Sequence, residues 1–216
     1  MGTSLIVGHL PDESTVTFVS NFVKNAFVSA GVEQSLQSFL GRFLSKSPLD
    51  QKVNSLILEW KAGPAEVGYL DTLNEASVVA FLEFTAKLEG TSSEEAIENS
   101  KWKNLPYWLQ SIWLPLEGVK VDPVVVEIEG MPTLIGTATG LVNDLEAIAT
   151  AADIGLKKKP NNFDLMLTDP KAFYGLKVAD LDEETTLRWI WHSYYAGAKL
   201  ALLRNKPLWS GDDGLH

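Results

Sequence analysis

The sequence predicts a mainly α-helical α+β protein, with a bundle-like helical core and one small β-hairpin or sheet around residues 119–138. Three observations favour this class. Apolar residues recur at three- and four-residue steps through most of the first hundred residues, which is the spacing of one helix face. A valine-rich stretch followed by Gly-Met-Pro is typical of a strand and a turn. Helical spacing then returns in the last third of the chain.

The first half is predicted to be helical throughout. Glycines close two of the expected helices, and a Ser-Pro pair, which suits an N-cap and the first helical position, opens another. The helices are expected at residues 15–31, 32–46, 48–61 (after Ser47) and 66–89, with a short acidic helix after Ser92 or Ser93.

The second half is predicted to be mixed. A proline-bounded aromatic segment should form one or two helical turns, and two β-prone stretches should pair as a hairpin before the next helix. These segments are residues 105–116, residues 124–129 with 133–137, and residues 141–154. Residues 157–162, Lys-Lys-Lys-Pro-Asn-Asn, are the clearest loop. The chain is expected to be one domain, 1–216, with possible subdomains 1–103 and 104–216.

The last long helix, residues 187–205, concentrates four large aromatic side chains within seven residues. Such a surface normally needs contacts on more than one side, so this helix is expected to run through the middle of the molecule. Asp180 or Asp182 should cap it, because acids gather at its start and bases at its end, as the helix dipole prefers.

The charge distribution is uneven. Residues 1–155 carry nine basic against twenty acidic side chains, whereas residues 156–206 carry nine against six. A nucleic-acid-binding protein needs the opposite balance to neutralise phosphates, so nucleic acid is not expected as a partner. An acidic body suits a basic protein partner instead.

The amino-acid composition excludes further classes of protein and of functional site. With no cysteine, the chain has no disulfide, thiolate metal site or cysteine nucleophile. Charges interrupt every apolar stretch before membrane-spanning length, so a water-soluble, cytoplasmic protein is expected. The three histidines supply no recognisable metal-ligand spacing, and no cofactor or metal is predicted.

One stripe of the last helix is the main candidate site. At about 100° per residue it collects basic and polar side chains. These are Arg188, His192, Tyr195, Lys199 and Lys206. The stripe is interpreted either as the cationic wall of an anion site, with His192 as proton donor or ligand, or, more simply, as a solvated face.

Two other features are candidates for ligand contact. Seven tryptophans are present, and Trp102, Trp108 and Trp113 fall within one short segment, where indole faces could bind a flat ligand or fill a core. Residues 136–140, Gly-Thr-Ala-Thr-Gly, lead from a predicted strand into a helix, a setting in which backbone N–H groups can bind an anion. A turn with Thr139 as N-cap is the simpler interpretation.

The sequence is compatible with two functions. The first is a non-enzymatic regulatory or inhibitory protein, of the immunity or antitoxin kind, whose acidic body binds a basic protein; the absence of a catalytic motif favours it. The alternative is a small-molecule-binding protein or enzyme acting on an anionic or aromatic ligand. Its candidate binding residues are Arg188, His192, Tyr195, Lys199, Trp108 and Trp113.

Overall fold

Strands are interspersed among helices in the computed structural model, which describes residues 2–8, 10, 13–31, 47–62, 66–106, 110–160 and 182–212. The helices among these residues are α1 (Glu13–Ser29), α3 (Pro48–Lys61), α4 (Glu75–Glu89), α5 (Ser93–Asn99), α6 (Ala138–Ala151) and α9 (Glu183–Arg204). The strands are β1 (Gly2–Gly8), β2 (Glu66–Asn74), β3 (Gln110–Leu114), β4 (Val124–Ile128), β5 (Met131–Thr137) and β6 (Leu208–Asp212).

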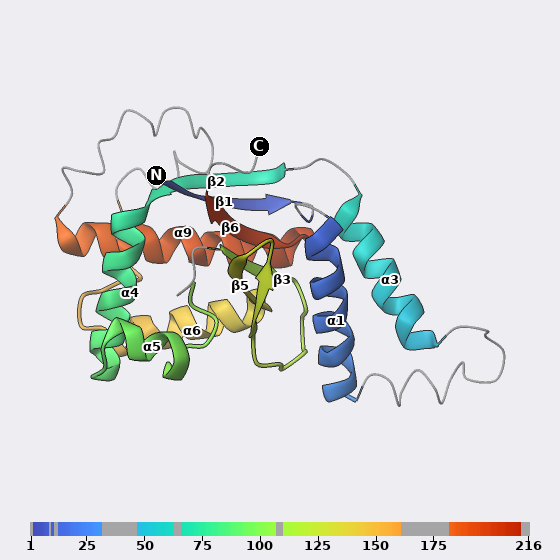
Figure 1. The fold of residues 1–216 in the computed structure, drawn as a ribbon. Helices are drawn as coiled ribbons and strands as arrows, with labels where there is room; N and C mark the ends of the chain where they lie inside the picture. Colours follow the sequence, from blue (N-terminus) through green and yellow to red (C-terminus); the bar gives the residue numbers. More distant parts are fainter. Residues whose placement is uncertain are drawn as a thin grey trace.

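The six strands form one mixed sheet in the order β2-β1-β6-β3-β5-β4 (Figure 1). β3 and β5 run parallel, and the other neighbouring pairs are antiparallel. The predicted fold class is therefore wrong about the sheet, which is much larger than one hairpin. Strands from both sides of residue 104 belong to it, and Leu5 of β1 lies opposite Ser210 of β6. Such pairing between distant segments leaves little trace in local periodicity.

Residues 66–89 form a strand and a helix, not the single helix that their spacing predicts. β2 pairs with β1 along its whole length, from Gly2 opposite Asn74 to Gly8 opposite Glu66. The sequence of this stretch, Glu-Val-Gly-Tyr-Leu-Asp-Thr-Leu-Asn, contains a glycine and β-prone residues that weaken a helix. Pairing with β1 therefore overrides the helical spacing, and α4 begins only at Glu75.

The prediction for residues 105–116 is also wrong, because residues 110–114 of this segment form a central strand instead of helical turns. β3 pairs with β5 on one side and with β6 on the other, and four of its five residues are buried. The predicted hairpin of residues 124–129 with 133–137 is confirmed as β4 and β5. Its turn was misplaced, because Met131 and Pro132, predicted to lie in the turn, belong to β5. The helix predicted at residues 32–46 lies outside the described residues.

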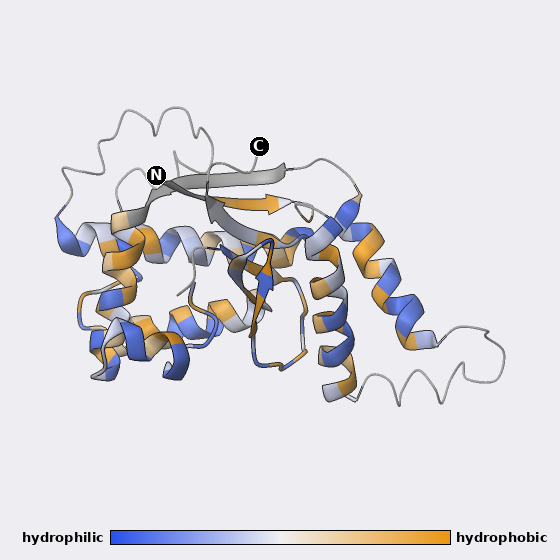
Figure 2. Ribbon diagram, viewed as in Figure 1, coloured by the Kyte–Doolittle hydropathy of each residue, from blue (hydrophilic) through white to orange (hydrophobic). Residues whose placement is uncertain are grey.

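The core is divided between the two faces of the sheet, because successive strand side chains point to opposite sides. Trp113 and Leu134 pack with α4, α6 and α9, whereas Ile112 and Ile135 pack with α1 and α3. Figure 1 shows these two groups of helices on opposite sides of the central strands. In Figure 2, hydrophobic and hydrophilic residues alternate along α1 and α3, as expected of helices that bury one side.

Helix α9 is buried on more than one side, as its aromatic content predicts. Its buried residues are Leu187, Trp189, Ile190, Trp191, Ser193, Tyr194, Gly197, Ala198 and Ala201. The predicted cap at Asp182 is confirmed, since its Oδ1 accepts from the Thr185 N–H at 2.8 Å. The helix ends at Arg204, and Asn205 adopts the left-handed conformation at the C-cap. Ser92 likewise caps α5 through its side chain.

Candidate functional site

A cavity of about 700 Å³ opens at the carboxyl ends of the parallel strands β3 and β5. Its walls are the first turns of α6, the loop between β3 and β4, and the segment before β3. The polar residues that line it are Ser29, Asn104, Lys120, Asp122, Thr137, Thr139, Asn143 and Asp144. In α/β sheets, ligands bind preferentially outside the carboxyl ends of parallel strands. This cavity is therefore the candidate site.

The cavity floor is the N-terminus of α6. Thr137 is the N-cap, and its Oγ1 accepts from the Gly140 N–H at 3.0 Å. The prediction that Thr139 caps this helix is wrong by one half-turn, because the cap must precede the first helical residue, Ala138. The Asn104 side chain occupies the space where an anion would bind, with its Oδ1 3.4 Å from the Thr137 N–H.

Asn104 is fixed by contacts to its main chain and side chain. Its carbonyl oxygen accepts from Trp113 Nε1 at 2.8 Å. The position of Asn104 therefore depends on the core between the sheet and helices α4, α6 and α9, to which Trp113 belongs. Its N–H and its Nδ2 both donate to Asp144 Oδ2, at 2.8 and 3.1 Å. Gly136 and Gly140 leave room for it, because a Cβ on either would lie within 2.7 Å of an Asn104 side-chain atom. The two glycines therefore make room for the Asn104 side chain and not for a bound phosphate.

Asp144 is the carboxyl group at the centre of the site. Burial raises the pKa of Asp144 above its ordinary value, and the nearby charge of Glu89 acts in the same direction. Hydrogen bonds from Asn104, and the charge of Lys103, lower this pKa and only partly offset burial. A carboxyl group with a raised pKa in a cavity is a common feature of binding and catalytic sites.

The remaining polar groups have few partners inside the protein. The Thr139 hydroxyl is buried and finds no hydrogen-bond partner among the described residues. Asn143 and Lys120 are exposed on the cavity walls. Asp122 forms an ion pair of 2.9 Å with Lys103 at the rim. The cavity thus offers two carboxyl groups, one ammonium group and several neutral polar groups to a ligand.

No protein family, curated protein or solved structure matches this chain. Within the described ranges, no group of three or more histidine, aspartate or glutamate side chains could hold a metal ion. No helix in that part of the chain is long and apolar enough to cross a membrane.

The residues predicted from the last helix lie outside this cavity. Arg188 and Tyr195 contact α6 or the loop after it, whereas Lys206 follows the end of α9 and donates to the Ala62 carbonyl, at the end of α3, at 2.7 Å. Arg188 donates to the Ile154 carbonyl at 3.0 Å and pairs with Glu184. A hydrogen bond to Glu146 raises the pKa of Tyr195, whose ring stacks on Trp191 with centroids 4.7 Å apart. The contacts with Ile154 and Glu146 join α9 to α6 and to the loop after it, whereas Glu184 and Trp191 lie on α9 itself. None of the stripe residues lines a described cavity.

The other predicted residues have diverse environments. Burial lowers the pKa of His192, as does the charge of Lys159, while hydrogen bonds to the backbone of Lys158 and Leu156 oppose both. Lys199 is exposed on α9. Trp113 is fully buried in the core, and its indole N–H donates to the carbonyl oxygen of Asn104. Trp108 lies outside the described residues.

Sequence reasoning missed Asn104 and Asp144. The Gly-Thr-Ala-Thr-Gly turn did identify the correct helix N-terminus, but the side chain that occupies it comes from 33 residues earlier in the chain. Asp144 follows the turn by one helical turn and therefore resembles any acidic residue on a helix surface. Only the presence of two glycines four residues apart indicated that something must approach the backbone closely.

We expect Asp144→Asn to change the pH dependence of stability, because asparagine keeps the shape and an oxygen that accepts from Asn104. In the wild type the folded-state pKa of Asp144 is raised above 3.8, so its contribution to stability is fully present below the unfolded pKa and is lost as pH rises through the folded pKa. The variant should therefore gain stability relative to wild type between about pH 4 and about pH 7. Urea unfolding at both pH values measures this. If the difference in stability between Asp144→Asn and wild type were the same at both pH values, the raised pKa of Asp144 would be contradicted.

Proposed function

We propose that this chain is a binding protein for a small polar molecule, held in the cavity beside Asp144. The observation that carries the proposal is a half-buried carboxyl group with a raised pKa in a cavity of about 700 Å³ at the ends of two parallel strands. Convergent polar groups in a large concave site are the usual mark of small-molecule binding. A cytoplasmic location, which the composition predicts, is part of the same proposal.

The charges of the cavity favour a ligand that donates hydrogen bonds. A free helix N-terminus attracts anions, but here the Asn104 oxygen accepts from the N–H of Thr137, the N-cap residue of α6. A phosphate would also meet the carboxyl groups of Asp122 and Asp144. Lys120 lines the cavity, but the other nearby lysine, Lys103, is already paired with Asp122 at the rim. Amine, amide and hydroxyl groups would instead find acceptors on both carboxyl groups. The ligand class that we propose is therefore a small polyhydroxyl, amide or amine compound.

A thermal-shift screen of small amines, amides, polyols and phosphates tests the proposal. We expect stabilising compounds among the first three groups, with a Kd that rises about tenfold in Asp144→Asn, because the variant loses one acceptor and a net hydrogen bond of about 1.4 kcal/mol. Lys199→Ala is the matched control, since Lys199 lies on the predicted stripe of α9 and outside the cavity. Isothermal titration of each compound against the three proteins gives the Kd values.

Three results would contradict this function. A screen without any stabilising compound would contradict the proposed ligand class. Equal binding by wild type and Asp144→Asn would show that the site does not include Asp144. Binding that is lost in Lys199→Ala but kept in Asp144→Asn would move the site to α9, where the sequence predicts an anion site.

A further inference from the structure

Strand β4 is one of the two edge strands of the sheet, and its pairing with β5 has a defined register. The hairpin turn consists of Glu129 and Gly130, whose φ angles of 52° and 79° are those of a type I′ turn. In such a two-residue hairpin the closing pair, Ile128 and Met131, is hydrogen-bonded, and the pairs then alternate. Pro132, which lacks an N–H, lies opposite Glu127 and so fits the non-hydrogen-bonded position.

This register places the N–H and C=O groups of Val125 and Glu127 on the side away from β5. No backbone hydrogen bond to these groups occurs outside the sheet in the described part of the chain. An edge with unpaired groups can accept another strand, and natural proteins usually protect it with lysine, proline or a covering segment. β4 contains no lysine and no proline.

Apolar side chains gather beside this edge. Of the eight large hydrophobic residues that are exposed in the described ranges, four lie on α5, β4 and the start of β5. They are Ile97, Val124, Val125 and Met131, with exposed fractions of 37%, 41%, 48% and 38%. Ile97 and Val125 also line a groove of about 280 Å³ between α5 and β4. This edge therefore offers backbone groups beside a groove of mixed polarity, which Ile97 and Val125 line together with Glu98, Ser100, Lys103 and Asp122.

The charge beside the edge is negative. Glu127 and Glu129 are exposed on the hairpin, and Glu98 lines the groove. The lysine that lines the same groove, Lys103, already pairs with Asp122 at 2.9 Å. A second copy of this chain would bring the same carboxylates against one another, whereas lysine or arginine side chains would be complementary.

We propose that the edge of β4 binds an extended, basic segment of a partner protein, which adds a strand to the sheet. Backbone groups of Val125 and Glu127 supply the hydrogen bonds, the groove beside Ile97 takes an apolar side chain, and the glutamates select basic residues. Strand addition of this kind draws its affinity from main-chain hydrogen bonds and its specificity from alternate side chains. The groove shares Asp122 with the Asp144 cavity, but the hydrogen-bonding groups of Val125 and Glu127 lie outside that cavity, so strand addition does not require a ligand there.

Two capped ten-residue peptides test the proposal, one alternating lysine and valine and the other alternating glutamate and valine. We expect the lysine peptide to bind the full chain, to slow hydrogen exchange at the N–H groups of Val125 and Glu127, and to bind more weakly as salt is raised. Glu127→Lys should weaken the lysine peptide at least about tenfold and favour the glutamate peptide. Fluorescence anisotropy and exchange measured by NMR give these results.

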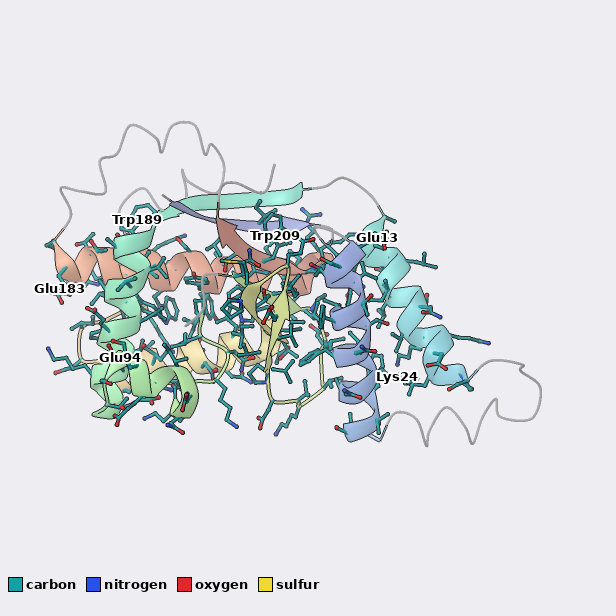
Figure 3. The ribbon with its side chains drawn as sticks, in the orientation of Figure 1. Glu13, Lys24, Glu94, Glu183, Trp189 and Trp209 are labelled. Carbon is teal, nitrogen blue, oxygen red and sulfur yellow. The ribbon has the colours of Figure 1, made fainter. Side chains whose placement is uncertain are left out.

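Two further variants complete the experiment. Val125→Pro removes an N–H that β5 does not use, so binding should be lost while the hairpin remains. Glu183→Gln is the charge control, because Glu183 lies on the first turn of α9, far from the hairpin in Figure 3, and it should bind as the wild type does. The proposal is overturned if neither peptide binds at millimolar concentration, if both bind equally, or if Glu127→Lys has no effect. Dimerisation of the wild type that Val125→Pro abolishes would also overturn it, since the occupant would then be a second copy.

Discussion

Replacing Trp191 with alanine is expected to lower the free energy of unfolding by about 3–5 kcal/mol, the usual cost of removing a large buried side chain. Trp191 is 3% exposed within the core between α9 and α6. Its Nε1 donates to the Leu145 carbonyl at 2.8 Å, and its ring stacks on Tyr195. The substitution therefore removes both apolar contacts and the hydrogen bond that joins the two helices.

Urea unfolding followed by far-ultraviolet circular dichroism measures this loss without relying on tryptophan emission. Leu203→Ala is the control on the same helix, because Leu203 is 78% exposed and should change stability by no more than about 0.5 kcal/mol. Trp191→Phe should fall between the two, since it keeps an aromatic ring but loses the N–H donor. A loss below about 1 kcal/mol for Trp191→Ala would contradict the packing of α9 against α6.

The elements that the sequence predicts correctly are those with local signals. Asp182 and Ser92 cap their helices through their own neighbours, and the β4–β5 hairpin closes over a two-residue turn. These contacts span only a few residues, so residue type and spacing are enough to indicate them. Helix α9 was recognisable for the same reason, from acids at its start and aromatics along its length.

The parts that could not be predicted depend on contacts between distant segments. β6 is a five-residue strand that follows a helix, and its place in the sheet is set by β1, at the other end of the chain. Trp209 in Figure 3 illustrates this, because it lies opposite Ile6 on one side and Ile112 on the other. The candidate site has the same origin, since Asn104, Gly140 and Asp144 meet only after β3 and β5 pair.

The second large effect is expected at Gly140, on the floor of the cavity. Within a helix, glycine to alanine normally stabilises by about 0.5–1 kcal/mol. Here the new Cβ would lie 2.6 Å from Nδ2 and 2.7 Å from both Cγ and Oδ1 of Asn104. The Asn104 side chain would have to leave its hydrogen bonds to Asp144 and Thr137. We therefore expect Gly140→Ala to destabilise the protein by about 1–3 kcal/mol, as overpacking does.

The same change made in an Asn104→Ala background should have the opposite sign. Once the asparagine side chain is absent, the alanine at position 140 meets no obstruction from it, and its helix propensity should raise stability by about 0.5–1 kcal/mol. Urea unfolding of the wild type, the two single variants and the double variant measures the coupling between the positions. A destabilisation that is equal in both backgrounds would mean that Asn104 is not what Gly140 accommodates. The Asp144 carboxyl would then owe its orientation to some other contact, and the cavity would have to be built on different residues.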